Sequence, residues 1–468
     1  MSVYLNYHYP KGTKLLNQIG NLNNSNHNKG KINKNNFWKQ YSNDVSGITG
    51  KAKTSIIPAQ NPNIYNNDKY NSDINNNYNY NFSNYNNNHG LASKHSNKKE
   101  LANSVNPYYD TRKLSYNDND NNNDINNNNI KKNNNNRNLE SIILSRVGLQ
   151  NIGNTCFMNT SLQILIHSED FIKRLLKKYP NFPKKSRITQ NFFHLCESIA
   201  SSQNLSSITP SDFKYQFGSS HSLFRGYGQN DTQEFFRILL EDMNKELNEV
   251  AHKAPYKELD TSKSKQECDK EYDKLIRSRE SSIVMDSFYG QIINIFTCKC
   301  GKISYSFEKI LDLPLLLNKR SMYLSIEQLL DDYFQEEEIY FEAKCEKCKK
   351  KRYHIKTVKF TQPPNILVLS LQRIDCKTKR KNDCMVVFSE ELNIKQYIDE
   401  ECGHGNEYKY LLYAIGNHSG SINFGHYYAY IKLNDTTWYE FNDSTVRKLG
   451  NIKTRSSAAY TLFYKKII

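Results

Sequence analysis

The chain has 468 residues, of which 37 % are hydrophobic, and it carries ten cysteines and a formal net charge of +16. This length is enough for one large domain or for about two to three average ones. The longest apolar run, residues 366–371, is far shorter than the ~20 residues of a membrane-spanning helix, so no contact with a membrane is expected.

The beginning of the chain and its cysteines bear on where the protein resides. It opens with MSVYLNYHYPKG, which lacks the apolar core of a secretory signal. The cysteines are spread along the chain without a compact framework. In a reducing compartment such cysteines serve as free thiols, metal ligands or a nucleophile rather than as disulfides. We therefore expect a cytoplasmic or nuclear protein.

Residues 1–140 form an Asn-rich N-terminal extension with few aliphatic side chains. Asn competes for backbone hydrogen bonds in non-helical states, and sparse apolar side chains cannot offset the entropy lost on ordering. We predict that this extension is disordered, either as low-complexity filler or as an arm that is modified or binds a partner. It carries 17 Lys and Arg against 9 Asp and Glu, about half of the positive excess. Because no arginine-rich helix or aromatic RNA-binding signature accompanies these charges, no specific nucleic-acid partner is expected.

The ordered part begins near residue 147 with a loop and a helix around Cys156. Residues 148–163 read GLQNIGNTCFMNTSLQ, in which Gly and Asn before the cysteine favour an irregular loop. Met158 and Leu162 then continue at helical spacing. Cys156 therefore starts a helix, where unpaired N–H groups and the helix dipole favour the nucleophilic thiolate. Asn151 in the loop can direct its amide at a developing oxyanion, a contact typically worth ~3–4 kcal/mol. The alternative is a small, buried, unreactive cysteine.

A second helix is predicted in residues 226–242, GYGQNDTQEFFRILLED. Asp231 as the N-cap and Glu234 three residues later make a capping box, which explains both acids without a function.

Two cysteine pairs lie 45 residues apart between presumed strands: Cys298 with Cys300, and Cys345 with Cys348. Paired cysteines on two turns are typical of a closed, structural zinc site. The first pair is C-x-C, one residue shorter than usual, so free thiols are the alternative.

Further on, residues 363–374, PPNILVLSLQRI, indicate a buried strand that ends near Arg373.

Near the C-terminus, GHYYAYIKL from residue 425 and TWYEFNDS from residue 437 predict an antiparallel hairpin. A two-residue turn at residues 434–435 would place His426 opposite Asp443. Even with a register shift of one residue, His426 lies beside Asn442 and Asp443. An amide or carboxylate oxygen there would orient the imidazole as a cysteine protease requires. The alternative is a hairpin histidine that simply bonds to a neighbour.

These segments resemble the ubiquitin-specific protease family of deubiquitinating cysteine peptidases. The first matches its Cys box, G-L-x-N-x-G-N-T-C-[FY]-M-N-x-x-L-Q, nearly residue for residue. The last resembles its His box, G-H-Y-x-A-Y…W-Y-x-F-[ND]-D. By this resemblance Cys156 is the nucleophile, His426 the base and Asn442 the third member of a triad. Asp443 is the alternative orienting residue, and Asn151 stabilises the oxyanion.

The resemblance also implies binding and metal residues. The 226–242 segment is similar to the family's Q-x-D-x-x-E-F box, whose acids bind the arginine-bearing tail of ubiquitin. The strand ending at Arg373 is similar to its L-x-R-F segment, with Ile374 in place of Phe. The residues expected to bind the tail are Gln229, Asp231, Glu234, Arg373 and Tyr427. Many members carry cysteine pairs at the tips of β-sheet fingers, which supports structural zinc on Cys298, Cys300, Cys345 and Cys348.

The implied fold is α+β, a papain-like cysteine protease hand that makes up a catalytic domain of residues 147–468. Its thumb would span residues 148–285, its fingers 286–357 and its palm 358–468. The implied reaction is hydrolysis of the peptide or isopeptide bond after the C-terminal glycine of ubiquitin through a thioester, without a catalytic metal. Ubiquitin and ubiquitinated proteins are the expected partners of a monomeric enzyme. The alternatives are a catalytically dead ubiquitin binder, a protease for a ubiquitin-like modifier, and a zinc-ribbon nucleic-acid binder.

Overall fold

The computed structural model describes residues 139–467, except residues 180, 181, 184, 203, 261, 262, 318–320, 342, 343, 376–379, 404–407, 422, 423 and 435. The extension predicted to be disordered lies outside the described residues, apart from residues 139 and 140. These two residues begin a helical turn that runs to residue 143, so regular structure starts slightly earlier than expected. Among the described residues, none of the helices is long and apolar enough to cross a bilayer.

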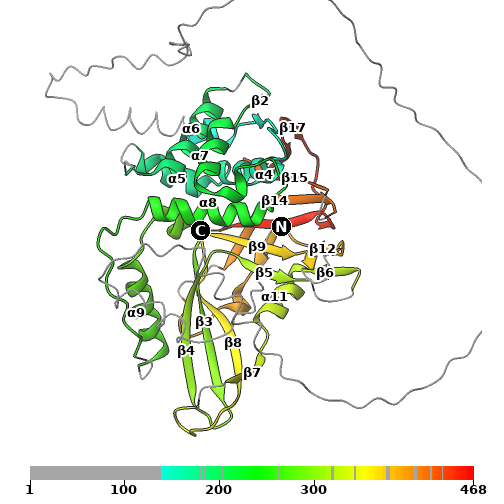
Figure 1. The fold of residues 1–468 in the computed structure, drawn as a ribbon. Coiled ribbons are helices and arrows are strands. Elements are labelled where there is room, and N and C mark those ends of the chain that lie inside the picture. Colours follow the sequence, from blue (N-terminus) through cyan, green and yellow to red (C-terminus); the bar gives the residue numbers. More distant parts are fainter. Residues whose placement is uncertain are drawn as a thin grey trace, which may run out of the picture. The chain divides into compact units, whose positions relative to one another are not determined.

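A group of helices forms the thumb, and most of them lie at the top of Figure 1. They are α4 (Cys156–Ile166), α5 (Glu169–Lys178), α6 (Arg187–Ser201), α7 (Ser211–Ser220), α8 (Thr232–Glu246) and α10 (Ile283–Phe288). The helix α5 shows why they pack: its apolar residues Phe171, Ile172 and Leu175 share one buried face, and charged residues cover the other. The helix α4 differs, because every one of its residues is buried between α8 and the strands of the palm.

The palm is an eight-stranded sheet in which the order is β17-β16-β15-β14-β19-β9-β5, with β13 added on β14. Its strands are β5 (Leu313–Leu316), β9 (Ile366–Gln372), β13 (Glu391–Asn393), β14 (Lys409–Gly420), β15 (Gly425–Leu433), β16 (Thr437–Asn442), β17 (Thr445–Lys448) and β19 (Ala459–Lys466). Only β5 and β9 pair in parallel within this sheet. One apolar cluster joins the sheet to the thumb, and a second packs it against α11 (Ile326–Phe334).

The fingers are a four-stranded sheet of order β4-β3-β8-β7, at the bottom of Figure 1. Its strands are β3 (Gly290–Cys298), β4 (Ile303–Ile310), β7 (Glu337–Phe341) and β8 (Arg352–Gln362). The helix α9 (Lys265–Arg277) packs against this sheet through Cys268, which contacts the cluster of Ile293 and Phe307. Shorter elements are β1 (Gly148–Leu149), β2 (Ser207–Ile208), β6 (Tyr323–Ser325), β10 (Ile374–Asp375), β11 (Arg380–Lys381), β12 (Met385–Val387), β18 (Arg455–Ser456) and the 3₁₀ turns Ser222–Phe224 and Lys395–Tyr397.

The predicted boundaries of the fingers need a correction. The segment 286–357 holds the finger strands, but between β4 and β7 the chain returns to the palm. There β5 joins the palm sheet, β6 pairs with β12, and α11 packs in the palm core. The apolar sequence of these elements requires a core, which a thin finger sheet does not offer.

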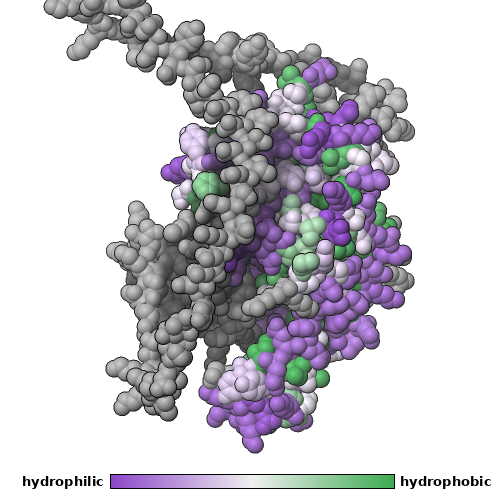
Figure 2. All heavy atoms as spheres, turned by 90° about the vertical axis from the view of Figure 1, so that its right-hand side faces the viewer, coloured by the Kyte–Doolittle hydropathy of each residue, from purple (hydrophilic) through white to green (hydrophobic). Residues whose placement is uncertain are grey.

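The surface contrasts with this interior. In Figure 2, hydrophilic residues cover most of the coloured part of the face shown, and apolar residues appear there only in small groups. The large apolar side chains of the described residues are instead concentrated in the clusters on either side of the palm sheet.

Four sulfur atoms meet where the turn after β3 approaches the turn between β7 and β8. The sulfurs of Cys298 and Cys348 are 3.9 Å apart, and those of Cys300 and Cys345 are 3.7 Å apart. All four lie within 4.8 Å of one another. Zn–S bonds of ~2.3 Å place the sulfurs of a tetrahedral site about 3.8 Å apart, so the arrangement fits zinc. The short C-x-C pair lies in a tight turn, in which the backbone N–H of Gly301 donates to the backbone oxygen of Cys298 at 2.8 Å.

We predict that the purified protein holds about one zinc ion per chain and that Cys345→Ser lowers this content to near zero, because a structural site needs all four sulfurs. Elemental analysis of the metal checks both expectations. Cys196→Ala is the matched control, since Cys196 is a buried cysteine of α6 outside the cluster. A Cys345→Ser variant that keeps its full metal content would contradict the assignment.

Candidate functional site

Cys156 is the first residue of α4, and the loop before it is built by Asn151. The amide oxygen of Asn151 accepts hydrogen bonds from the backbone N–H groups of Gly153 and Thr155, both at 3.1 Å. Gly153 and Asn154 take positive φ angles of 107° and 53°, which turn the chain into the helix. The thiol thus lies at the N-terminal end of a buried helix, where backbone N–H groups lack helical acceptors.

His426 is the second residue of β15, at the open end of the hairpin with β16. Its Nε2 lies 2.7 Å from Oδ1 of Asn442 and 3.9 Å from Oδ2 of Asp443. The hairpin register differs by one residue from the prediction, because Leu433 pairs with Thr437. The connection is therefore one residue longer than a two-residue turn. With this register Asn442, rather than Asp443, is the nearer partner of the imidazole.

The structure brings His426 and Cys156 together although they are 270 positions apart. A hydrogen bond to the side chain of Cys156 raises the pKa of His426 to about 9, despite partial burial, and Asn442 and the charge of Asp443 add to this increase. These groups favour the imidazolium, because each accepts a hydrogen bond from it or attracts its positive charge. Since Nε2 faces Asn442, the other ring nitrogen is left for the sulfur.

Asp443 connects the two halves of the site. Its carboxylate accepts hydrogen bonds from the amides of Asn151 at 2.9 Å and Asn159 at 2.8 Å. Its backbone oxygen accepts from the N–H of Leu149 at 2.9 Å. Asp443 itself has φ 47°, a conformation that Asp tolerates better than most residues. The residue therefore joins the loop before the cysteine to the strand that follows the histidine.

This contact changes the expectation for Asn151. One amide hydrogen of Asn151 is directed at Asp443, and an amide nitrogen carries two. Only the second hydrogen remains for an oxyanion. Asn159 was not identified as a site residue from the sequence, although the Cys-box pattern contains an Asn at this position, about one turn after Cys156.

The residues expected to bind the ubiquitin tail separate into two groups. Gln229 is exposed, and its side-chain amide bonds to both backbone groups of Gly425 at 3.2 and 3.3 Å, next to His426. Glu234 is half-buried on the first turn of α8. Asp231 and Tyr427 are instead buried, at 7 % exposure each, and bond to each other at 3.3 Å.

Asp231 has a structural explanation that the sequence only partly revealed. One carboxylate oxygen caps α8 by accepting from the N–H groups of Gln233 and Glu234, as expected of an N-cap. The other accepts from the hydroxyl groups of Tyr427 and Tyr460. The hydroxyl of Tyr427 is directed at this buried carboxylate rather than at the surface, so its expected role as a tail-binding residue needs a correction. Burial of both partners leaves Gln229 and Glu234 as the accessible members of the predicted set.

The expectation for Arg373 is also corrected. Its side chain is fully buried, and its guanidinium donates to the backbone oxygens of Ala459, Asn382, Cys384 and Ser456. Burial lowers the pKa of Arg373 to about 10. A guanidinium enclosed in this way holds the strands of the palm together and does not reach a ligand at the surface.

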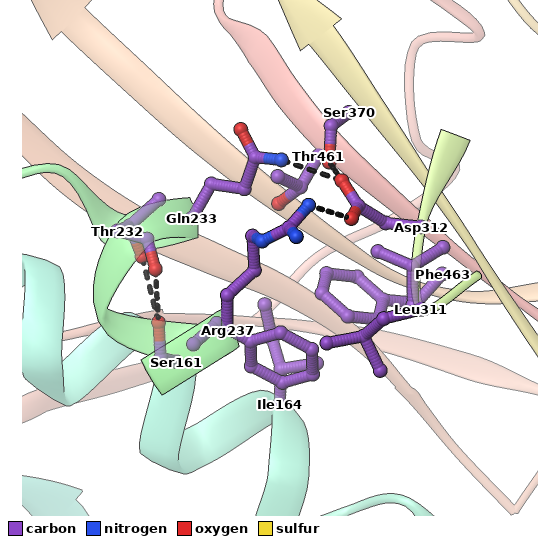
Figure 3. Close-up of a pocket in the computed structure, with 12 residues that line it drawn as sticks. Ser161, Ile164, Thr232, Gln233, Arg237, Leu311, Asp312, Ser370, Thr461 and Phe463 are labelled. Carbon is purple, nitrogen blue, oxygen red and sulfur yellow. Dashed lines mark hydrogen bonds and ion pairs between the residues drawn. The ribbon is translucent and has the colours of Figure 1, made fainter. Parts of the chain in front are cut away.

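Another buried charge, that of Asp312, connects the thumb to the palm, as Figure 3 shows. Asp312 accepts hydrogen bonds from Gln233 and Arg237 of α8 and from Ser370 of β9, at 2.5 to 2.7 Å. These residues line a pocket between the two lobes. Because the Asp312 side chain is 2 % exposed, these donors are needed to offset its desolvation.

Comparisons with known proteins bear on the family of this chain. A family model described as ubiquitin carboxyl-terminal hydrolase matches residues 147–464. Ubiquitin carboxyl-terminal hydrolase 2 of Rattus norvegicus is 31 % identical over 334 residues, which are 68 % of this chain and 53 % of that protein. The protein of the same name from Gallus gallus is 31 % identical over 340 residues, 69 % of this chain and 94 % of that one. The chain spans about half the length of the mammalian relatives of this name that it matches.

The solved structures show the fold. A Ubp8-containing SAGA DUB module bound to ubiquitin aldehyde matches with a TM-score of 0.55 and 23 % identity over 70 % of each chain. The same module bound to monoubiquitin matches with a TM-score of 0.56. This likeness confirms the predicted α+β fold class. Together with the family model and the relatives, it confirms the resemblance seen in the sequence motifs: the chain belongs to the ubiquitin carboxyl-terminal hydrolase family.

Proposed function

We propose that this protein is a thiol-dependent deubiquitinase that hydrolyses the bond after the C-terminal glycine of ubiquitin. The observation that carries the proposal is the imidazole of His426, whose pKa is raised by Cys156 and which lies 2.7 Å from Oδ1 of Asn442. The names of the relatives and the ubiquitin ligands of the similar structures support ubiquitin as the substrate. The free cysteines of the described part support a reducing compartment, the cytoplasm or the nucleus.

The proposed reaction begins with a Cys156 thiolate and a His426 imidazolium. The sulfur attacks the carbonyl carbon of the terminal glycine, and the resulting oxyanion accepts from the backbone N–H of Cys156 and the second amide hydrogen of Asn151. As the C–N bond breaks, His426 gives its proton to the departing amine, and a thioester remains. His426 then takes a proton from water, which attacks the thioester. The C-terminal carboxylic acid of ubiquitin leaves and loses its remaining proton to solvent, and the thiolate and imidazolium are restored.

The accessible residues near this site support recognition of a basic tail. Gln229 contacts the backbone directly before His426, and Glu234 follows on the first turn of α8. A carboxylate at this place suits guanidinium groups, because charge-assisted hydrogen bonds are stronger than neutral ones. We therefore propose that Gln229 and Glu234 contact the tail, while Asp231 positions Tyr427 beneath it.

Replacing the nucleophile is the direct test. Cys156→Ala is expected to abolish cleavage of a ubiquitin–fluorophore reporter, because no sulfur remains to form the thioester, while binding of ubiquitin survives. Initial rates and calorimetric titration measure the two properties. Cys196→Ala is the control and should cleave normally. Parallel reporters made from ubiquitin-like modifiers test the choice of modifier. Full activity of Cys156→Ala would refute the mechanism, and turnover of a different modifier alone would refute the substrate.

The pKa of His426 predicts the pH dependence. Because its partners raise the pKa to about 9, the imidazolium persists below that pH and is lost above it, so kcat/KM should decline on the alkaline side near pH 9. Asn442→Ala removes an acceptor that favours the imidazolium, and the alkaline limb should move down by about one pH unit. A pH profile of reporter cleavage measures both. An alkaline limb that stays in place in Asn442→Ala would show that Asn442 does not bond to the imidazolium.

A further inference from the structure

Glu440 is a buried carboxylate directly behind the amide that orients His426. It lies two residues before Asn442 on β16, so both side chains point to the same face of the sheet. Glu440 is 4 % exposed. A buried charge is costly unless hydrogen-bond or ionic partners offset its desolvation, so its partners need to be identified.

The hydrogen bonds of Glu440 link it to the site. Its Oε1 accepts from Nδ2 of Asn442 at 3.2 Å. Its Oε2 accepts from Nε and Nη2 of Arg447 at 3.1 and 2.8 Å, and Arg447 is its direct cross-strand partner on β17. On the other side of Asn442, Oδ1 meets His426. Arg447, Glu440, Asn442 and His426 thus form one continuous chain of polar contacts.

The chemistry of these linked hydrogen bonds determines which way the amide of Asn442 points. An ionised carboxylate only accepts hydrogen bonds, so Glu440 can face the NH₂ group of Asn442 but not its oxygen. The oxygen must then point to His426, where it accepts from the imidazolium. A reversed amide would present N–H to N–H, and the imidazolium would lose its partner.

The surroundings of Glu440 strengthen its effect on the orientation of the Asn442 amide. Tyr430 pairs with it across β15, and the ring of Tyr428 lies between Tyr430 and His426. Burial raises the pKa of both tyrosines, and the negative charge of Glu440 raises it further. Among the described residues, the carboxylate accepts hydrogen bonds from the cation of Arg447 and from the amide of Asn442. The Glu440 side chain is 6 % exposed, so its attraction for the NH₂ group is screened less than at the surface, although the Arg447 side chain is 66 % exposed.

We propose that Glu440, paired with Arg447, is a positioning residue that holds the amide oxygen of Asn442 toward His426. Glu440 touches neither the substrate nor the sulfur, so it acts only through Asn442. The inference rests on the proposed function, because it concerns the orientation of the proposed base.

The isosteric variant Glu440→Gln gives a sharp test. A glutamine has one oxygen, and Arg447 with its two donors captures that oxygen. The NH₂ group of Gln then faces Asn442 and reverses its amide. We expect kcat on the ubiquitin–fluorophore reporter to fall about tenfold or more, as when orientation of a general acid–base is lost. KM should change little, and the alkaline limb of the pH profile should move down. A space-filling role for Glu440 would predict almost no effect, since Gln has the same shape.

A double variant reverses the expectation. In Glu440→Gln with Arg447→Met, the Gln oxygen no longer has the guanidinium to bond and can accept from Asn442 again, so kcat should rise above that of Glu440→Gln alone. Arg447→Met alone keeps the bond between Glu440 and Asn442, and kcat should fall less than in Glu440→Gln. Its stability should fall more, because a buried carboxylate loses its partner. Activity and thermal stability would therefore rank the variants differently.

Glu390→Gln is the matched control, because Glu390 pairs with Lys432 of β15 at 2.7 Å through a carboxylate remote from Asn442. Its kcat should equal that of the wild type. A kcat of Glu440→Gln within about twofold of the wild type, or a double variant no more active than Glu440→Gln, would overturn the inference.

An NMR titration of His426 separates this inference from the proposed function, because it needs no turnover. The pKa of His426 should be lower in Glu440→Gln than in the wild type, and an unchanged pKa would overturn the inference even if the reporter proved not to be a substrate. If the wild type cleaves no modifier while the pKa still falls, the proposed function fails and the positioning role of Glu440 stands.

Discussion

The geometry of the site depends on Asp443, which accepts hydrogen bonds from the opposite lobe. Two amides, from Asn151 before the nucleophile and Asn159 in α4, donate to its carboxylate, and Leu149 donates to its backbone oxygen. The close approach is strict, because a Cβ on Gly148 would lie 2.5 Å from the backbone oxygen of Ser444. The loop that carries the thiol and the strand that carries the orienting amide are thereby held in one geometry. Pre-organisation of this kind is what general acid–base catalysis requires.

Buried charges connect several elements of this fold, and each has its own hydrogen-bond partners. Asp231, Asp312 and Arg373 are each 7 % exposed or less, and each makes several hydrogen bonds to a different element. Such contacts add little net stability, because desolvation offsets most of their attraction. Their directional character instead defines how α8 lies on the palm and how the palm strands meet. The relative placement of thumb and palm therefore rests on polar geometry as well as on apolar packing.

The sequence predicted the local features of the site well and its long-range partners less well. The helix start at Cys156, the N-cap Asp231 and the hairpin near His426 follow from short patterns, and the structure contains all three. The register of the hairpin was wrong by one residue, because the composition of a turn does not determine its length. The motif around Arg373 indicated a residue of interest, but burial depends on strands such as β19 that lie far along the chain. Glu440 was missed for the same reason, since its partner Arg447 is recognised only once β16 and β17 are paired.

The return of the chain to the palm between the finger strands determines what a bound metal would enclose. The two cysteine pairs lie on either side of a segment that joins the palm through β5 and α11. Direct pairing of β3 with β8 brings the two pairs together across that segment. A metal ion held by all four sulfurs would therefore close a loop of the chain that contains part of the palm, and its binding would stabilise both regions.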